Sequence, residues 1–390
     1  MKTGTLRLQD RDTMPLNQED SSFSFTSGER ELSVSGLRER IDTPAHGSHL
    51  ASGALRRSID QAFERARQAG QENPIVVGAI PFDTTQASSL YVPEAYTWQA
   101  RTAAPVQTGS LPALLSQANI PDEHGFKRAV RHAIVNFQHS DVRKAVLSVQ
   151  RELHFAAPVD TAQVQANLKA LNREGYHFRV PLADGSTLLG VSPELLVHKQ
   201  GTAFVSNPLA GSVRRMADPE ADRANAQWLA ASEKDHYEHR LVTEDIAQRV
   251  GELCSRLQVP ERPSLISTAA LWHLSTRIEG ELASADIDAL QLACRLHPTP
   301  AVCGYPTERA RQLIRFVEPF ERGLFTGMVG WCDAQGNGEW VVTIRCGTFS
   351  GQRVRLFAGA GIVEASSPDS EWNEVQTKLG TMLRACGLDH

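Results

Sequence analysis

Short apolar runs joined by tight polar turns constrain the fold of this chain more than any other feature. Residues 327–331 and 340–344 flank a turn that contains two glycines. Residues 176–182 and 186–190 flank Ala183-Asp184-Gly185 in the same way. Runs of this length and composition, separated by such turns, predict β-hairpins. Because the two strands of a hairpin are antiparallel, the chain is expected to build antiparallel sheet.

Long helical patterns lie between these strand pairs. Apolar residues recur at intervals of three and four in residues 52–69 and 371–385, and the longest helical pattern covers residues 218–257. No repeat or linker divides the chain, so we expect one large α+β domain over residues 21–390, with antiparallel sheet covered by helices. Residues 1–20 are polar with little periodicity and are expected to form a loose N-terminal segment.

Composition narrows the class of function. Of the 390 residues, 41% are hydrophobic and 22% charged, which is typical of a soluble globular protein. No apolar stretch reaches the roughly 20 residues of a membrane span, and the polar N-terminus has no secretory signal. A net charge of −5 without a basic run argues against nucleic-acid binding. Six cysteines without a Cys-x-x-Cys pair indicate reduced thiols in a cytoplasmic protein.

One stretch near the C-terminus has the composition of a site for a small anion. Arg345 follows a strand-like β-branched run, and residues 358–361 are expected to form a glycine loop whose backbone a ligand can approach closely. Glu371 and Glu374 stand three apart in a helical pattern and therefore share one face. Together with Lys378, these residues predict a site for an anion and a hard cation.

A second acid pair repeats this spacing in the longest helical pattern. Asp235 and Glu238 also stand three residues apart. Two such pairs can hold one Mg²⁺, which prefers a few carboxylates together with water and substrate oxygens. The alternative is a solvated helix face, which spacing alone favours for an arbitrary acid pair.

Three further ionisable residues stand beside apolar runs. Glu194 is either at a strand edge in water, the alternative that local sequence favours, or a buried proton donor. Lys144 is either a strand-end charge or a desolvated base. His273 is more often a satisfied core histidine than a catalyst. Residues 358–361 lack the trailing glycine of a dinucleotide fingerprint, so a nicotinamide cofactor is not expected.

Several short motifs occur together along the chain. They are Pro-Leu-Ala-Gly-Ser at 208–212, Ser-Glu-Lys-Asp at 232–235 with Glu-His at 238–239, Leu-His-Pro-Thr-Pro-Ala at 296–301, Val-Gly-Trp at 329–331, Thr-Ile-Arg-Cys at 343–346 and Phe-Ala-Gly-Ala-Gly-Ile-Val at 357–363, preceded by residues 77–83 and 89–94. In these motifs the chain resembles the isochorismate synthases of siderophore pathways. They belong to the chorismate-utilising family, with anthranilate, aminodeoxychorismate and salicylate synthases. The resemblance covers residues 20–388.

This resemblance implies a fold and a reaction. The fold is a single α/β/α-layered domain with two stacked antiparallel sheets flanked by helices. The reaction is the Mg²⁺-dependent isomerisation of chorismate to isochorismate, which would feed siderophore synthesis through salicylate or 2,3-dihydroxybenzoate. Water adds at ring C2 while the C4 hydroxyl departs and the double bond migrates. Chorismate and isochorismate are then the small-molecule partners, and the subgroup suggests a monomer.

The resemblance also implies roles for individual residues. Lys144 matches the base that activates water, Glu194 matches the acid that protonates the leaving hydroxyl, and His273 matches a histidine near the C4 side. The residues that match metal ligands, direct or through water, are Glu238, Glu374, Asp235 and Glu371. The residues that match substrate-binding positions are Gly211, Ser212, Ala301, Arg345, Gly359 and Lys378. Of these, Arg345 suits a two-pronged grip on the enolpyruvyl carboxylate.

Other members of the family provide the alternatives. Ala210 stands where aminodeoxychorismate synthases place a nucleophilic lysine, and Lys144 suits water as the nucleophile. Salicylate synthases share Lys144 and Glu194 and add pyruvate elimination, so that activity stays open. The family commonly has an arginine directly after Leu-Ser where this chain has residues 149–151, Val-Gln-Arg. If that arginine supports the base, Arg151 must replace it, and a non-catalytic homologue is the second alternative.

Overall fold

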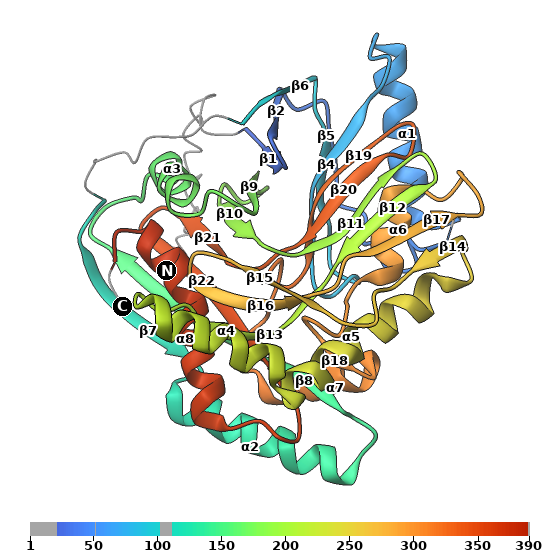
Figure 1. Ribbon diagram of the computed structural model, residues 1–390. Coiled ribbons are helices and arrows are strands. Elements are labelled where there is room, and N and C mark those ends of the chain that lie inside the picture. Colours follow the sequence, from blue (N-terminus) through green and yellow to red (C-terminus); the bar gives the residue numbers. More distant parts are fainter. Residues whose placement is uncertain (1–21, 51, 102–110, 389–390) are drawn as a thin grey trace, which may run out of the picture.

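Two large antiparallel sheets stacked face to face form the centre of the molecule (Figure 1). The computed structural model describes residues 22–50, 52–101 and 111–388, so the segment 1–20 that was expected to be loose lies outside the described residues. The first sheet has ten strands. In order across the sheet they are β18 (Gly304–Tyr305), β8 (Lys144–Phe155), β22 (Arg353–Ile362), β21 (Cys346–Ser350), β10 (Thr187–Ser192), β9 (Tyr176–Pro181), β1 (Ser24–Ser27), β2 (Arg30–Ser35) and β6 (Ala95–Ala100), with β7 (Leu114–Ile120) also paired to β8.

The second sheet has nine strands, and a third, smaller sheet has three. The nine are β14 (Cys254–Gln258), β17 (Ile278–Leu282), β12 (Ala203–Asn207), β11 (Leu195–Gln200), β20 (Gly338–Val342), β19 (Met328–Asp333), β4 (Ile75–Ile80), β5 (Ser89–Val92) and β3 (Glu39–Ile41). The three are β13 (Leu209–Arg214), β16 (Leu271–Ser275) and β15 (Ser264–Ser267). Within the described residues every strand pair is antiparallel.

Helices cover the outer faces of both large sheets (Figure 1). Those on the ten-stranded sheet are α2 (Glu123–His139), α3 (Thr161–Leu171), α7 (Thr307–Val317) and α8 (Pro368–Ala385). Those on the nine-stranded sheet are α1 (Ala54–Gln68) and α6 (Ala289–Leu296). α4 (Pro219–Ala231) packs on the small sheet, and α5 (Glu233–Gly251) packs on the small sheet and on β14 and α6. In the part of the chain that the structure describes, no helix is both long and apolar enough to cross a membrane.

Three apolar cores correspond to these layers. One lies between the ten-stranded sheet and its helices and includes Phe126 and Val375. A second lies between the nine-stranded sheet and its helices, around Trp340. The third lies between the sheets and includes Phe178 and Val329. The expected fold of two stacked antiparallel sheets flanked by helices is therefore confirmed.

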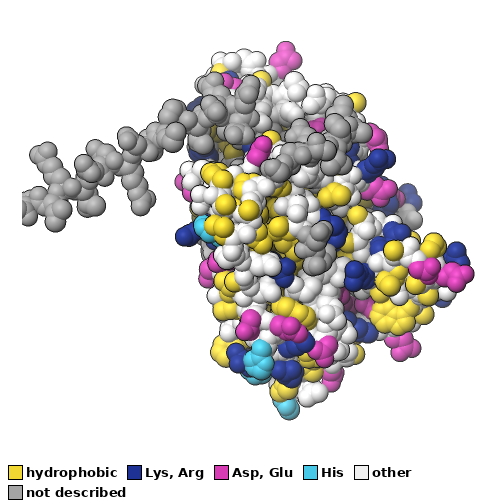
Figure 2. Space-filling view, turned by 90° about the vertical axis from the view of Figure 1, so that its left-hand side faces the viewer, with side chains coloured by type: hydrophobic (Ala, Val, Ile, Leu, Met, Phe, Trp, Pro, Cys, Tyr) yellow, Lys and Arg dark blue, Asp and Glu magenta, His cyan; other side chains and the backbone are white. Residues whose placement is uncertain are grey.

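The molecular surface in Figure 2 has mixed charge. On this face the Lys and Arg side chains are interspersed with Asp and Glu side chains, and apolar groups are visible between them. Interspersed charges of both signs produce little net field over a surface of this size.

Two local predictions are wrong in a way that matters for the site. Residues 218–257 are not one helix, because Ser232 takes an extended conformation that ends α4, and its Oγ accepts the Asp235 N–H at the start of α5. Residues 358–361 are not a loop either, because they continue β22 and pair with β8. The first correction places Asp235 in the first turn of a helix, and the second places Gly359 and Gly361 in a sheet.

Candidate active site

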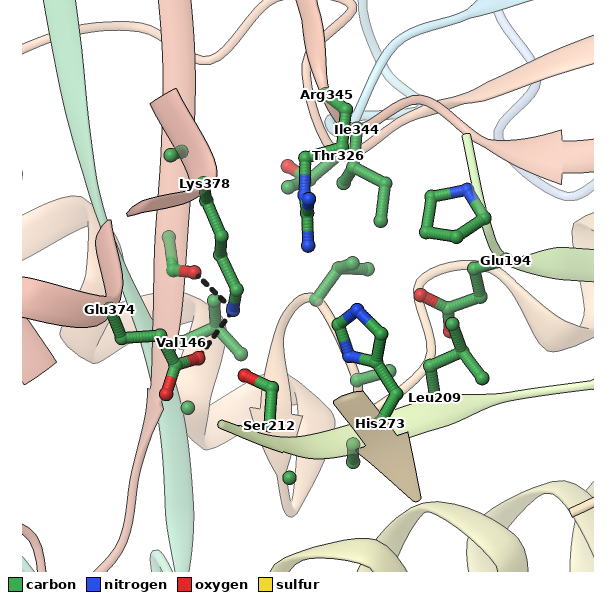
Figure 3. Close-up of a pocket in the computed structure, with 18 of the residues that line it drawn as sticks. Val146, Glu194, Leu209, Ser212, His273, Thr326, Ile344, Arg345, Glu374 and Lys378 are labelled. Carbon is green, nitrogen blue, oxygen red and sulfur yellow. Dashed lines mark hydrogen bonds and ion pairs between the residues drawn. The ribbon is translucent and has the colours of Figure 1, made fainter. Parts of the chain in front are cut away.

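A pocket lies where β8 and β22 of the ten-stranded sheet approach the small sheet, α5 and α8 (Figure 3). It encloses about 660 Å³ including its mouth. Its lining residues are Val146, Pro193, Glu194, Leu209, Ala210, Gly211, Ser212, Glu238, His273, Ala301, Val302, Phe325, Thr326, Ile344, Arg345, Phe357, Ala358, Gly359, Gly361, Glu374 and Lys378. These residues are up to 232 positions apart in the chain (378 − 146), so only the fold brings them together.

Most of the predicted site residues line this pocket. They are Glu194, Gly211, Ser212, Glu238, His273, Ala301, Arg345, Gly359, Glu374 and Lys378. Lys144 is not in the lining but pairs with Glu238. Asp235 and Glu371 line a neighbouring cleft, which shares Ser212 and Glu374 with the pocket. The structure therefore gathers every predicted site residue except Lys144 in two adjoining spaces, and Lys144 contacts the lining residue Glu238. The roles of these residues stay predictions.

Glu194 is buried, not at a strand edge in water. It follows Ser192 and Pro193 between β10 and β11, and its N–H donates to Ser192 Oγ at 3.2 Å. Burial raises the pKa of the Glu194 carboxyl to about 7, although a backbone hydrogen bond from Leu209 and the charge of Lys144 oppose the increase. A carboxyl with this pKa is protonated in a large fraction of molecules near neutral pH and can act as an acid.

Lys144 is the first residue of β8 and has no solvent exposure. Its Nζ lies 3.0 Å from Glu238 Oε1, but it makes no hydrogen bond of acceptable geometry within the described residues. Gly361 stands beside this pair, since a Cβ there would overlap the Glu238 carboxylate and lie 3.0 Å from Lys144 Cε. The absence of a side chain at Gly361 therefore gives the ion pair its space.

A second lysine–carboxylate pair lies on α8. Lys378 Nζ is 2.5 Å from Glu374 Oε1 and donates a 2.9 Å hydrogen bond to the Gly359 carbonyl of β22 (Figure 3). Burial raises the pKa of Glu374, but the positive charges of Lys378 and Lys234 outweigh burial and lower it overall. Lys378 thus connects the Glu374 carboxylate on α8 to the Gly359 carbonyl on β22.

The other two predicted metal residues face the neighbouring cleft. Lys234 Nζ is 2.8 Å from Glu371 Oε1, and Ser232 Oγ donates to the Asp235 carboxylate. Burial and then repulsion from Glu374 raise the pKa of Glu371 to about 7. Burial also raises the pKa of Asp235, and repulsion from Glu238 and Glu374 adds to the increase. The four carboxylates therefore lie close enough to repel one another.

These four carboxylates fit a hard divalent cation by donor type. They offer only oxygen ligands, which Mg²⁺ prefers, and their mutual repulsion would fall if a cation bound among them. In the described residues, however, no three His, Cys, Asp or Glu side chains converge as a ready metal cluster, and lysines hold three of the carboxylates. The Mg²⁺ site stays a prediction.

Arg345 and His273 face the same pocket space (Figure 3). Arg345 is buried and has a φ of 49°, and its Nη1 lies 3.4 Å from Thr381 Oγ1. Burial lowers its pKa to about 10, so it stays a cation at neutral pH. His273 is also buried, and burial holds its pKa well below its usual value. Because no group in the described residues pairs with His273 Nε2, it is not the satisfied core histidine that local sequence favoured.

Sequence reasoning missed a buried ion pair under the pocket. Arg322 Nη2 lies 2.6 Å from Glu318 Oε1, and the two side chains are 3% and 4% exposed. Arg322 donates to the carbonyls of Val146 at 2.7 Å and Val302 at 2.9 Å, while Glu318 Oε1 accepts the Ser148 N–H at 2.8 Å. The pair therefore holds β8 against the segment that carries the Ala301 wall. Its only signal in the sequence is a Glu and an Arg four apart, a spacing that usually marks an exposed pair.

The departure from the family at residues 149–151 lies outside the pocket. Val149 packs in the core beneath the ten-stranded sheet. Arg151 donates to Asn119 Oδ1 at 2.8 Å and to Gln376 Oε1. Neither residue lines the pocket, and in the described residues neither forms a hydrogen bond or ion pair with Lys144. The buried arginine that supports this part of β8 is Arg322, not Arg151.

Comparison with known proteins shows which family this chain resembles. The family model described as "Chorismate binding enzyme" matches residues 84–387. The isochorismate synthase EntC of Escherichia coli K12 is 46% identical over 373 residues, which are 94% of this chain and 95% of that protein. The isochorismate synthase DhbC of Bacillus subtilis is 41% identical over 381 residues, which are 95% of this chain and 94% of that protein.

Solved structures agree with the fold. A 2,3-dihydroxybenzoate-specific isochorismate synthase, DhbC of Bacillus anthracis, superimposes with a TM-score of 0.89 at 39% identity and covers 96% of this chain and 98% of its own. The menaquinone-specific isochorismate synthase MenF of Escherichia coli has a TM-score of 0.80 at 27% identity, over 94% of this chain and 89% of its own.

Proposed function

The chain belongs to the chorismate-binding enzyme family, and we propose that it is an isochorismate synthase that isomerises chorismate with the help of Mg²⁺. The observation that carries the proposal is a buried acid in the pocket lining, Glu194, with a pKa of about 7, together with a buried amine, Lys144, that contacts the lining residue Glu238. The relatives named above are isochorismate synthases, which are isomerases.

The pocket has cations for a substrate with two carboxylates. Arg345 is a buried guanidinium, and Lys378 is an ammonium that also engages Glu374 and Gly359. A guanidinium can bind a carboxylate through two parallel hydrogen bonds. We assign Arg345 and Lys378 to the substrate carboxylates, with Gly211, Ser212 and Gly359 as close neighbours and Ala301 as a pocket wall.

The exchange of one hydroxyl for another needs a base and an acid. Water is a weak nucleophile, and Lys144 would take its proton as the oxygen adds at C2. Hydroxide is a poor leaving group, and Glu194 would protonate the C4 hydroxyl as it departs. The base has to start without its proton, and the acid has to start with one. A buried carboxyl with a pKa near 7 meets this requirement for the acid. His273 is neutral and would contribute a hydrogen bond to the C4 side.

We assign the metal site to Glu238 and Glu374, with Asp235 and Glu371 acting through water. When bound, Mg²⁺ would hold the ring carboxylate and withdraw electron density from the ring. The repulsion among the four carboxylates supports this assignment. The greater likeness to the 2,3-dihydroxybenzoate-specific relative than to the menaquinone-specific one supports a place in siderophore synthesis. Cytoplasmic location and a monomeric state stay predictions.

Incubation of the purified protein with chorismate and Mg²⁺ is expected to produce isochorismate, resolved from chorismate by chromatography. Salicylate and pyruvate, formed without an added lyase, would identify a salicylate synthase instead. Protein that consumes no chorismate would support the non-catalytic alternative. All three outcomes are read from one chromatogram with a pyruvate assay beside it.

Removal of divalent metal with a chelator is expected to abolish turnover, because the proposed reaction needs the ion to hold the ring carboxylate and withdraw electron density from the ring. Addition of Mg²⁺ is expected to restore it. Binding of the ion can be followed by calorimetry in the absence of chorismate, where Glu374→Gln should weaken it. Full turnover in metal-free protein would contradict the assignment.

The pH profile of kcat is expected to contain a limb set by the Glu194 pKa of about 7, because the reaction needs protonated Glu194 and that form predominates only below this pKa. Glu194→Gln should lower kcat by roughly 100-fold and remove this limb of the profile. The matched control is Glu339→Gln. Glu339 is another buried carboxyl whose pKa burial raises to about 7, but it is not among the pocket residues. A profile that changes equally in both variants would rule out Glu194 as the acid.

A further inference from the structure

Two arginines outside the pocket line the cleft that adjoins it. Arg214 is the last residue of β13, and Arg384 lies in the last turn of α8. The two elements pack against each other (Figure 1). Their cleft shares Ser212 and Glu374 with the pocket, so a molecule in the cleft is next to the pocket.

Neither guanidinium has a counter-ion in the part of the chain that the structure describes. In the described residues no ion pair and no side-chain hydrogen bond involves the guanidinium of Arg214 or Arg384. The adjacent Arg215 differs, because it pairs with Asp222 at 2.9 Å and stacks on the Trp272 ring at 4.5 Å. Arg215 is thus part of the scaffold, whereas the two unpaired guanidiniums remain available to an anion.

The two guanidiniums are also close enough to repel each other. Arg384 is half-buried, and burial followed by the charge of Arg214 lowers its pKa. Like charges held together without a counter-ion cost the folded state free energy. An anion between them would recover that free energy, which is the property of a binding site.

A third guanidinium continues this arrangement into the pocket. Burial lowers the pKa of Arg345, and the charge of Arg384 adds to the decrease. Thr381, which contacts Arg345, lies one turn before Arg384 on α8. Three acidic groups line the cleft. Asp235 accepts a hydrogen bond from Ser232, Glu371 pairs with Lys234, and Glu374 pairs with Lys378. Positive charge is therefore available from the surface at Arg214, through Arg384, to Arg345 inside.

We propose that Arg214 and Arg384 form an outer anion subsite through which a small dicarboxylate enters the pocket and its isomer leaves. The inference rests on the proposed function, which supplies the dicarboxylate. Arg345 then receives one carboxylate inside. Because the outer arginines do not line the pocket, they act on capture of the substrate and not on the chemical step.

Kinetics of Arg214→Ala, Arg384→Ala and the double variant test the subsite. At low ionic strength the double variant is expected to raise KM about fivefold to tenfold with kcat unchanged, as expected for two partly exposed charges. At about 0.5 M salt, where the Debye length is only a few ångströms, the difference in KM should disappear. Arg384→Lys keeps the positive charge, so its KM should stay near that of the wild type. Arg256→Ala, which removes an exposed charge from β14 at the edge of the other sheet, should leave KM unchanged.

An inorganic anion separates the subsite from the substrate pocket. At constant ionic strength, sulfate is expected to raise the KM of the wild type more than that of the double variant. Active wild-type protein with an unchanged KM in the double variant would overturn the subsite alone. A fall in kcat, or a KM difference that persists at high salt, would also overturn it. Wild-type protein that turns over no chorismate would instead overturn the proposed function. The outer subsite, which rests on that function, would then be overturned as well.

Discussion

Replacement of Lys144 with Ala is expected to lower kcat for chorismate turnover by about 10²- to 10⁴-fold, the range that a positioned general base contributes. Lys144 is a fully buried amine, and in the described residues Glu238 is its one ion-pair partner. The substitution also leaves Glu238 buried beside Asp235 and Glu374 without that cation, so some loss of stability is expected as well. The measurement is steady-state kinetics by chromatography, together with thermal unfolding.

Two further experiments separate the chemistry from the fold. Lys144→Arg keeps a positive charge beside Glu238 but cannot give up its proton, since an arginine stays charged at any ordinary pH. It should therefore retain more stability than Lys144→Ala and remain equally inactive. A small primary amine added to Lys144→Ala should restore part of the turnover in proportion to its free-base concentration. Turnover in Lys144→Arg near the wild-type rate would show that Lys144 is not the base.

Replacement of Arg322 with Met is expected to destabilise the protein by roughly 3–5 kcal/mol, the usual result of removing one partner of a buried ion pair. Glu318 would keep only the Ser148 N–H, and the carbonyls of Val146 and Val302 would each lose a donor. The measurement is the urea midpoint of unfolding.

The double variant Glu318→Gln with Arg322→Met should recover part of this loss, because it leaves no unpaired buried charge. The matched control is Arg315→Met. Arg315 also pairs with a carboxylate, Asp83, but its side chain is 59% exposed, so its loss should cost less than about 1 kcal/mol. An equal shift for the two single variants would contradict the structural importance of the buried pair.

The secondary structure could be predicted where its signal is local. The hairpin at β19 and β20 and the helix α8 follow from turn residues and apolar spacing that lie within the elements themselves. The division between α4 and α5 had a signal too, because Ser232 and Asp235 form the Ser-x-x-Asp pattern of a helix start. Residues 358–361 had no such signal. Their conformation is set by pairing with β8, which is more than 200 residues earlier in the chain.

The composition of the site could be named in advance by family resemblance, but its environment could not. Glu194 and His273 both looked ordinary beside their neighbours, and burial by distant segments removed them from water. The same is true of Glu318 and Arg322, whose spacing is that of a surface pair until β8 covers them. Local sequence therefore determined the hairpin strands, most of the helices and the residue types that chemistry requires. The tertiary structure alone decided which charges are buried and which neighbours each one has, because desolvation and Coulomb attraction depend on distances between segments that are far apart in the chain.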